Sequence, residues 1–122
     1  MISYDEFKKV EIKAGKILSA EKVPDTDKLF RLSVDFAENR EDVAEDGTKV
    51  SKPVRRQIIS GIAAYFPDPQ LLVGKTCMFV TNLEPRMIRG LESQGMILAV
   101  KTETGFSLLE PNATIAPGSA AS

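Results

Sequence analysis

The alternation of apolar and polar residues over short stretches constrains the fold of this chain more than any other feature. Residues 29–36, LFRLSVDF, place alternate apolar side chains on one face of an extended strand, namely Phe30, Leu32, Val34 and Phe36. Residues 10–23, VEIKAGKILSAEKV, alternate in the same way and predict a long strand that bends or bulges at Gly15. The turn-forming run PDTDK lies between the two stretches, so together they predict a β-hairpin with one buried face.

Further short stretches of the same kind follow along the chain. The sequence predicts strands at residues 55–66, 76–80 and 94–100, and a sixth short strand within residues 102–110. Residues 67–74, PDPQLLVG, have Pro at the start and Gly at the end, which predicts a short helix between the third and fourth strands. That order of elements is typical of the OB-fold, a five-stranded Greek-key barrel. We therefore expect an all-β fold of this type with short extensions at both termini.

The first ten residues predict a short helix. Ser3 and Glu6 have the spacing of a capping box, in which each side chain bonds to the backbone N–H of the other residue. Phe7 and Val10 follow three residues apart, and we expect both side chains to face the core.

Residues 38–54 differ in composition from the rest of the chain. They are rich in charge, poor in large apolar residues and contain the turn dipeptide Asp46-Gly47, so we expect an exposed charged insertion, a solvated loop. An EF-hand calcium loop needs a regular alternation of oxygen ligands, which this segment lacks. Residues 111–122 consist largely of small residues and turn formers and are expected to form a C-terminal tail. The length suits one domain, so we expect residues 1–122 to form a single domain.

Charge and composition exclude several classes of function. The chain has 16 Lys and Arg against 17 Asp and Glu, a net charge of −1, so any nucleic-acid site must be local. It has no histidine and one cysteine, Cys77, which removes imidazole ligands, Ser-His dyads, disulfides and Cys-based metal sites. We find no convergent catalytic set and expect neither enzymatic activity nor a metal or cofactor. Without a long apolar run or a signal segment, we expect a soluble cytoplasmic protein whose Cys77 is buried and reduced.

Residues 82–100, NLEPRMIRGLESQGMILAV, carry the densest group of candidate binding residues. Pro85 restricts the backbone, so the chain leaving the fourth strand turns sharply and presents Arg86 and Arg89 on a short turn. Guanidinium groups suit phosphate because their planar donors bond bidentately. Neutral side chains able to bond ribose or base edges surround them: Asn82, Ser93 and Gln94. These residues alone leave two readings open, a phosphate-binding corner or a tight connection whose arginines are merely solvated.

Several ordered motifs resemble one family. The segments DEFKKVEIKAGKI, DKL, RQIISGIA and NLEPRMIRGLESQGMILAV look like the tRNA-binding domain at the C-terminus of bacterial methionyl-tRNA synthetases, also found in free-standing tRNA-binding proteins. The similarity covers nearly the whole chain. It implies a non-catalytic module, appended to a synthetase or free-standing as its beta chain, that increases tRNA affinity and forms a homodimer. Its implied partners are tRNA, a second copy and the catalytic chain of the synthetase. The export-related chaperone CsaA has a similar barrel, so binding of unfolded peptides is the alternative.

The resemblance and the residue chemistry together give a set of expected tRNA-binding residues: Lys28, Arg31, Arg55, Asn82, Arg86, Arg89, Ser93, Gln94 and Met96. Lys28, Arg31 and Arg55 lie at strand ends or on the polar side of the second strand, where they would extend the basic surface around Arg86. Met87 stands where the family commonly has a lysine. We therefore expect one phosphate contact fewer than in the family unless Arg89 replaces it.

Aromatic residues for base stacking are few. Phe30, Phe36 and Phe79 are expected in the core, which leaves Tyr65 and Phe66 as exposed candidates. We therefore expect recognition through shape and backbone contacts rather than base reading.

Overall fold

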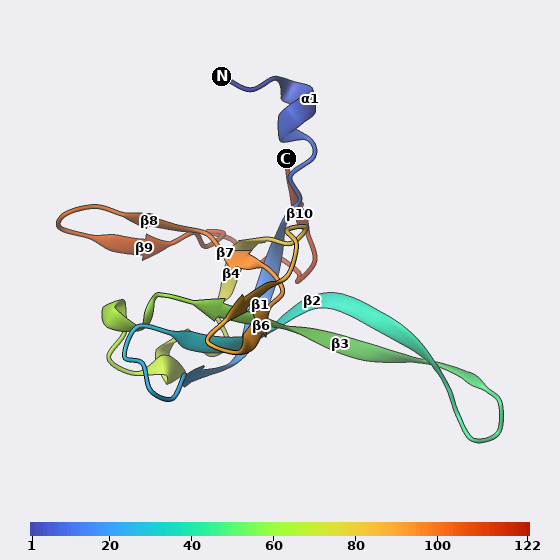
Figure 1. Ribbon diagram of the computed structural model, residues 1–122. Helices are drawn as coiled ribbons and strands as arrows, with labels where there is room; N and C mark the ends of the chain where they lie inside the picture. Colours follow the sequence, from blue (N-terminus) through green and yellow to red (C-terminus); the bar gives the residue numbers. More distant parts are fainter.

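The computed structural model describes all residues of the chain, 1–122, as a curled antiparallel sheet from which several segments project (Figure 1). The main path of the sheet has the order β3-β2-β1-β4-β7, with bounds Lys49–Ser60, Phe30–Val43, Ile12–Lys22, Thr76–Val80 and Met96–Ile97. The sheet curls so that the residues just before β7 approach β3, and there the Gln94 N–H donates to the carbonyl of Gln57 on β3 at 2.8 Å. The all-β, OB-like barrel expected from the sequence is confirmed.

The connection between β3 and β4 contains the helical segment that the sequence predicts there. It consists of two 3₁₀ turns, η1 (Ala63–Tyr65) and η2 (Pro69–Leu72). The side chain of Asp68 caps η2 by accepting from the Gln70 N–H at 2.9 Å, and Gly74, at a φ of +89°, follows the segment. Four helical residues lie between the cap and Gly74, so η2 is a tight 3₁₀ turn.

The predicted fifth strand at residues 94–100 is divided in the structure. Its first part is β7 in the main sheet, whereas β8 (Ala99–Lys101) pairs with β9 (Phe106–Leu108) in a separate hairpin. Leu98 stands at the division, where its N–H donates to the Met78 carbonyl and its carbonyl accepts from the Leu109 N–H. Leu98 is half-buried, whereas Ile97 is buried and is the core residue of this stretch.

The core lies inside the curled sheet and confirms the alternation of residues 29–36, because Phe30, Leu32, Val34 and Phe36 are all buried. Gly15 has a role in packing: a Cβ there would lie 2.5 Å from the Phe36 ring and 2.6 Å from Val34. The irregularity in the β1–β2 ladder falls between Ile17 and Ser19 instead of at Gly15. The expected bulge is therefore displaced, since Gly15 serves close packing of the side chains behind it.

Residues 38–54 form an extended β-hairpin instead of the expected solvated loop, and we call this segment the arm (Figure 1). The β2–β3 ladder continues out to the pair Val43↔Lys49. Asp46-Gly47 forms the predicted turn, with the Gly47 N–H donating to the Ala44 carbonyl at 2.9 Å. Asp42 stabilises the ladder through an ion pair with Lys52 at 3.3 Å. Both faces of the arm meet solvent, so its side chains are mostly charged and exposed.

The two chain ends lie close together, beside the start of β1 (Figure 1). The capping box of Ser3 and Glu6 is present and starts helix α1 (Tyr4–Phe7). Residues 111–122 return to the barrel, where β10 (Ala120–Ala121) pairs with the start of β1. Phe7 and Val10 are 43% and 42% exposed, so the expectation that they face the core of their own chain is wrong. Helices in this chain are too short to cross a membrane.

Candidate nucleic-acid interface

A polar hollow of about 310 Å³ lies on the outer surface of β1, β2 and β3, and we call it the outer hollow. Its polar lining consists of Ser19, Glu21, Arg31, Ser33, Arg55, Gln57 and Gln94. The ladder registers explain this lining, because Ser19, Ser33 and Gln57 form one cross-strand row and Glu21 and Arg31 are direct partners in the next. Three expected binding residues, Arg31, Arg55 and Gln94, therefore meet at one place.

The two arginines of the outer hollow differ in their electrostatic state. Arg31 forms an ion pair with Glu21, and the two side chains are 43% and 56% exposed. Arg55 is exposed and has no carboxylate within 4.0 Å, although Asp35 is its register partner on β2. Arg55 is thus available to an anion as it stands, whereas Arg31 must exchange Glu21 for a phosphate.

Residues 82–95, which we call the corner, form a small hairpin of β5 (Arg86–Ile88) and β6 (Leu91–Ser93). Arg89 and Gly90 make its turn, with φ values of +53° and +78°. Both φ values lie in the left-handed region, which is the conformation that a two-residue hairpin turn requires. Arg86 and Arg89 therefore lie at opposite ends of β5 instead of on one short turn after Pro85. Both are exposed and neither has an ion pair.

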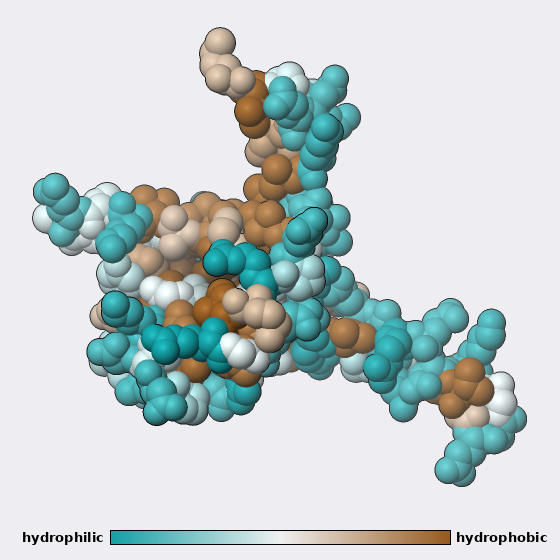
Figure 2. All heavy atoms as spheres, in the orientation of Figure 1, coloured by the Kyte–Doolittle hydropathy of each residue, from teal (hydrophilic) through white to brown (hydrophobic).

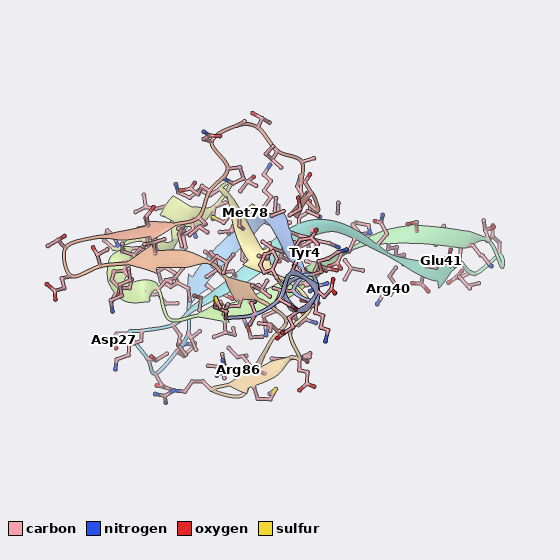
Figure 3. The ribbon with its side chains drawn as sticks, turned by 90° about the horizontal axis from the view of Figure 1, so that it is seen from above. Tyr4, Asp27, Arg40, Glu41, Met78 and Arg86 are labelled. Carbon is pink, nitrogen blue, oxygen red and sulfur yellow. The ribbon has the colours of Figure 1, made fainter.

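The corner lies next to the β1–β2 loop, residues 23–29. Leu91 of the corner, Pro24 of the loop and Arg31 line one further hollow, so Arg31 is flanked by both. Figure 3 shows Arg86 on the corner and Asp27 on the loop. Lys28 is exposed on this loop, and its carbonyl accepts from the Ala63 N–H. The side chain of Lys28 does not line the outer hollow.

Three neutral residues expected to contact RNA are engaged inside the chain. Asn82 accepts from the Glu11 N–H at 2.8 Å and donates to the Lys9 carbonyl at 2.6 Å, which fixes the segment before β1. Ser93 is buried, accepts from the Ile59 N–H at 3.0 Å and donates to the Gly95 carbonyl. The Gln94 side-chain oxygen accepts from the Gln57 N–H at 2.9 Å. Backbone groups at the edge of β3 and before β1 need partners, and these side chains supply them.

Met96 lies apart from the outer hollow. It is 46% exposed and lines a separate hollow of about 70 Å³ together with Arg86 and Ser93. Six of the nine expected residues thus fall into two groups, Arg31, Arg55 and Gln94 at the outer hollow and Arg86, Ser93 and Met96 at the smaller one, whereas Lys28, Asn82 and Arg89 line neither.

Arg56 is an important residue of this region, although the expected binding set includes only its neighbour Arg55. Its Nε and Nη2 donate to the two carboxylate oxygens of Glu38, each at 2.7 Å, and Nη1 donates to the carbonyls of Thr81 and Gln94. The hydrogen-bonded Glu38 carboxylate raises the pKa of Arg56 above its ordinary value. Successive side chains of a strand point to opposite faces, so Arg55 and Arg56 lie on opposite faces of β3. This alternation is the one feature of the sequence that could have distinguished the two arginines.

Both aromatic candidates for stacking pack against Phe106. The ring of Tyr65 stacks on Phe106 with centroids 4.0 Å apart, and Phe66 packs edge-on against the same ring at 5.9 Å. Lys101 lies 5.4 Å from the centroid of Tyr65. These contacts attach the β8–β9 hairpin to the barrel, and the stack with Phe106 covers one face of the Tyr65 ring.

Comparison with known proteins settles the family. The sequence model described as "Putative tRNA binding domain" matches residues 12–120. The chain belongs to this tRNA-binding-domain family. A relative named methionine–tRNA ligase from Methanospirillum hungatei is 46% identical over 117 residues, which are 96% of this chain and 15% of the relative. The chain spans between 13% and 16% of the length of the curated relatives that it matches.

Solved structures agree with the family fold. A methionyl-tRNA-synthetase-related protein from Pyrococcus horikoshii is 34% identical, with a TM-score of 0.79 over 99% of this chain and 97% of that one. The chaperone CsaA from Bacillus anthracis has a TM-score of 0.76 over 100% of this chain and 99% of its own, at 24% identity. At that identity the likeness to CsaA concerns the fold alone. The family match, residues 12–120, contains the outer hollow, the corner and the whole arm.

Proposed function

We propose that this tRNA-binding domain is a non-catalytic module that increases the tRNA affinity of a methionyl-tRNA synthetase in the cytoplasm, as an appended domain or a free-standing chain. The observation that carries the proposal is the outer hollow, where the unpaired Arg55 lies beside Arg31 and Gln94 in a member of this family. Relatives named methionine–tRNA ligase, and a related protein from P. horikoshii, support the synthetase as the partner.

The charges available for phosphate are few. Arg55, Arg86 and Arg89 are exposed and free of ion pairs, and Arg31 is next to them. Roughly three to five phosphate contacts give weak binding, and log affinity should fall against log salt with a slope of about −2 to −4. We therefore expect micromolar affinity for tRNA with little sequence preference, because base-reading groups are scarce.

A fluorescence anisotropy titration of labelled tRNA tests the proposal. Arg55→Ala and Arg86→Ala should each weaken binding because each removes an unpaired cation from the proposed surface. Lys75→Ala is the matched control, since Lys75 is ion-paired with Glu110 at 3.3 Å and lines neither hollow. An absence of tRNA binding at low salt, or equal losses in all three variants, would contradict the proposal.

The proposed module is a homodimer that associates through its two ends. None of the first ten residues is buried, and Ile2 and Tyr4 are 66% and 72% exposed (Figure 2). A groove of about 200 Å³ lies between this segment and β10, lined by Tyr4, Phe7 and Ala121 among others. A four-residue helix without buried side chains is not stable alone, and a second copy would cover its apolar residues.

Sedimentation velocity tests this dimer. Tyr4→Ser and Phe7→Ser should shift the protein toward monomers at tens of micromolar, while Val43→Ser should not, because Val43 is equally apolar but lies near the tip of the arm. A monomeric parent protein would show that the ends do not associate.

Peptide binding is the second candidate function. It is favoured by the fold shared with CsaA and by the same apolar groove beside β10. Competition separates the candidates: an unfolded peptide should leave tRNA binding unchanged if the outer hollow holds tRNA. Displacement of tRNA by the peptide would favour the chaperone-like function.

A further inference from the structure

The guanidinium of Arg56 holds the two ends of the corner. Its Nη1 donates to the Thr81 carbonyl and, at 3.2 Å, to the Gln94 carbonyl. Thr81 immediately precedes the corner and Gln94 is its next-to-last residue. A single nitrogen atom therefore joins the strand that enters the corner to the segment that leaves it.

The other edge of the same guanidinium is fixed by Glu38 at the base of the arm. Two parallel hydrogen bonds of 2.7 Å set the plane and the direction of the group, and the ring of Phe36 lies 5.4 Å from its central carbon. The side chain of Arg56 is 21% exposed. Its hydrogen bonds to protein occupy four of the five N–H donors of an arginine, so little is left for a phosphate.

The corner needs such support. The β5–β6 ladder has three residue pairs, and an isolated two-stranded hairpin of this size is marginal in water. Its attachments to β3 are the hydrogen bonds of Ser93 and Gln94, the bond from the Gln57 side chain to the Glu92 carbonyl at 2.9 Å, and the two carbonyl bonds of Arg56. A surface held in its binding geometry before RNA arrives loses less conformational entropy on binding.

We propose that Arg56 is a positioning residue for tRNA binding: it holds Arg86 and Arg89 at a fixed place beside the outer hollow and makes no RNA contact itself. This inference rests on the proposed tRNA-binding function. Arg55 is the natural comparison, because it is the adjacent residue, has the same side chain and lies on the opposite, outward face of β3.

The test compares Arg56→Lys with Arg55→Ala in tRNA titrations at several salt concentrations. Lysine keeps the charge, but its ammonium cannot bond Glu38 and both carbonyls at once. Arg56→Lys should lower tRNA affinity about 3- to 10-fold with an unchanged salt slope, and should speed amide hydrogen exchange in residues 86–93. Arg55→Ala should lower affinity and flatten the slope by about 0.7 to 0.9, with exchange in the corner unchanged.

Two further variants make the outcome decisive. Glu38→Gln removes the ion pair but keeps one acceptor oxygen for Arg56 and both carbonyl bonds, so it should lower tRNA affinity less than Arg56→Lys does, with an unchanged salt slope. Arg56→Gln keeps one N–H donor group for a carbonyl. If Arg56→Lys does not fold, the salt dependence of tRNA binding is measured on Arg56→Gln instead. A flattened slope, or parent-like affinity, in the Arg56 variants overturns the inference alone. A parent protein that binds no tRNA overturns the proposed function as well.

Discussion

Replacing Glu21 by glutamine should strengthen tRNA binding. Glu21 pairs with Arg31 at the wall of the outer hollow, so its carboxylate competes with phosphate for the same guanidinium. The two side chains are 43% and 56% exposed, and an ion pair so exposed contributes at most about 1 kcal/mol. That is the free energy that tRNA must replace when Arg31 turns to a phosphate. Its removal should raise affinity by up to about fivefold at low salt.

The salt dependence of the Glu21→Gln variant gives a second, independent readout. A fully available Arg31 adds one contact, so the slope of log affinity against log salt should steepen by about 0.7 to 0.9. The melting temperature should fall only slightly, because the lost ion pair contributes at most about 1 kcal/mol to stability. Anisotropy titrations at several salt concentrations measure both affinity and slope.

Glu110→Gln is the matched control for this change. It alters net charge equally and breaks a comparable exposed pair, with Lys75 at 3.3 Å, but Glu110 does not line the hollow. Equal gains in both variants would mean that overall charge is responsible. Weaker binding by Glu21→Gln would refute the reasoning outright, because it would show that Glu21 holds Arg31 in place instead of competing for it.

Four other predictions concern the corner and the core. Arg86→Ala and Arg89→Ala should each flatten the salt slope by about 0.7 to 0.9 with little change in melting temperature. By contrast, Ile97→Ala, at a core position 7% exposed, should cost about 2 to 5 kcal/mol in denaturant unfolding and weaken binding only through unfolding. Burial raises the pKa of the Cys77 thiol from 9.0 to about 11. The unfolded chain therefore loses this proton first, so stability should fall as pH rises from about 9 to about 11, and Cys77→Ala should lack that part of the loss. Gly15→Ala should destabilise the protein by about 1 to 3 kcal/mol, measured by thermal unfolding, because its Cβ meets the core side chains of Phe36 and Val34.

The barrel was predictable because one face of each main strand is buried. Residues 29–36 show this best, since their alternate side chains are all in the core. The arm was mistaken for a loop for the converse reason. Both of its faces meet solvent, so neither face needs apolar side chains, and residues 38–54 show no alternation of apolar and polar residues. Cross-strand pairs such as Arg40↔Lys52 become visible only once the register is known.

The candidate site was predictable in composition and less so in geometry. The sequence identified the charged residues, but it does not show which polar groups the chain itself consumes. Asn82 bonds to residues more than seventy positions away, and the Arg56 partner Glu38 follows a register shift in the β2–β3 ladder. Such partners follow from how the strands curl and not from local spacing.

The measurement that tests the central claim most directly is the mapping of tRNA onto the isotope-labelled protein by NMR chemical shifts at low salt. The claim is that tRNA lies on the outward face of β1, β2 and β3 and on the corner. Titration with tRNA should shift the signals of Arg31, Arg55, Arg86 and Arg89 and leave those of α1 and β10 unchanged. Shifts confined to α1, β10 and the apolar groove between them, or an absence of shifts, would contradict the account.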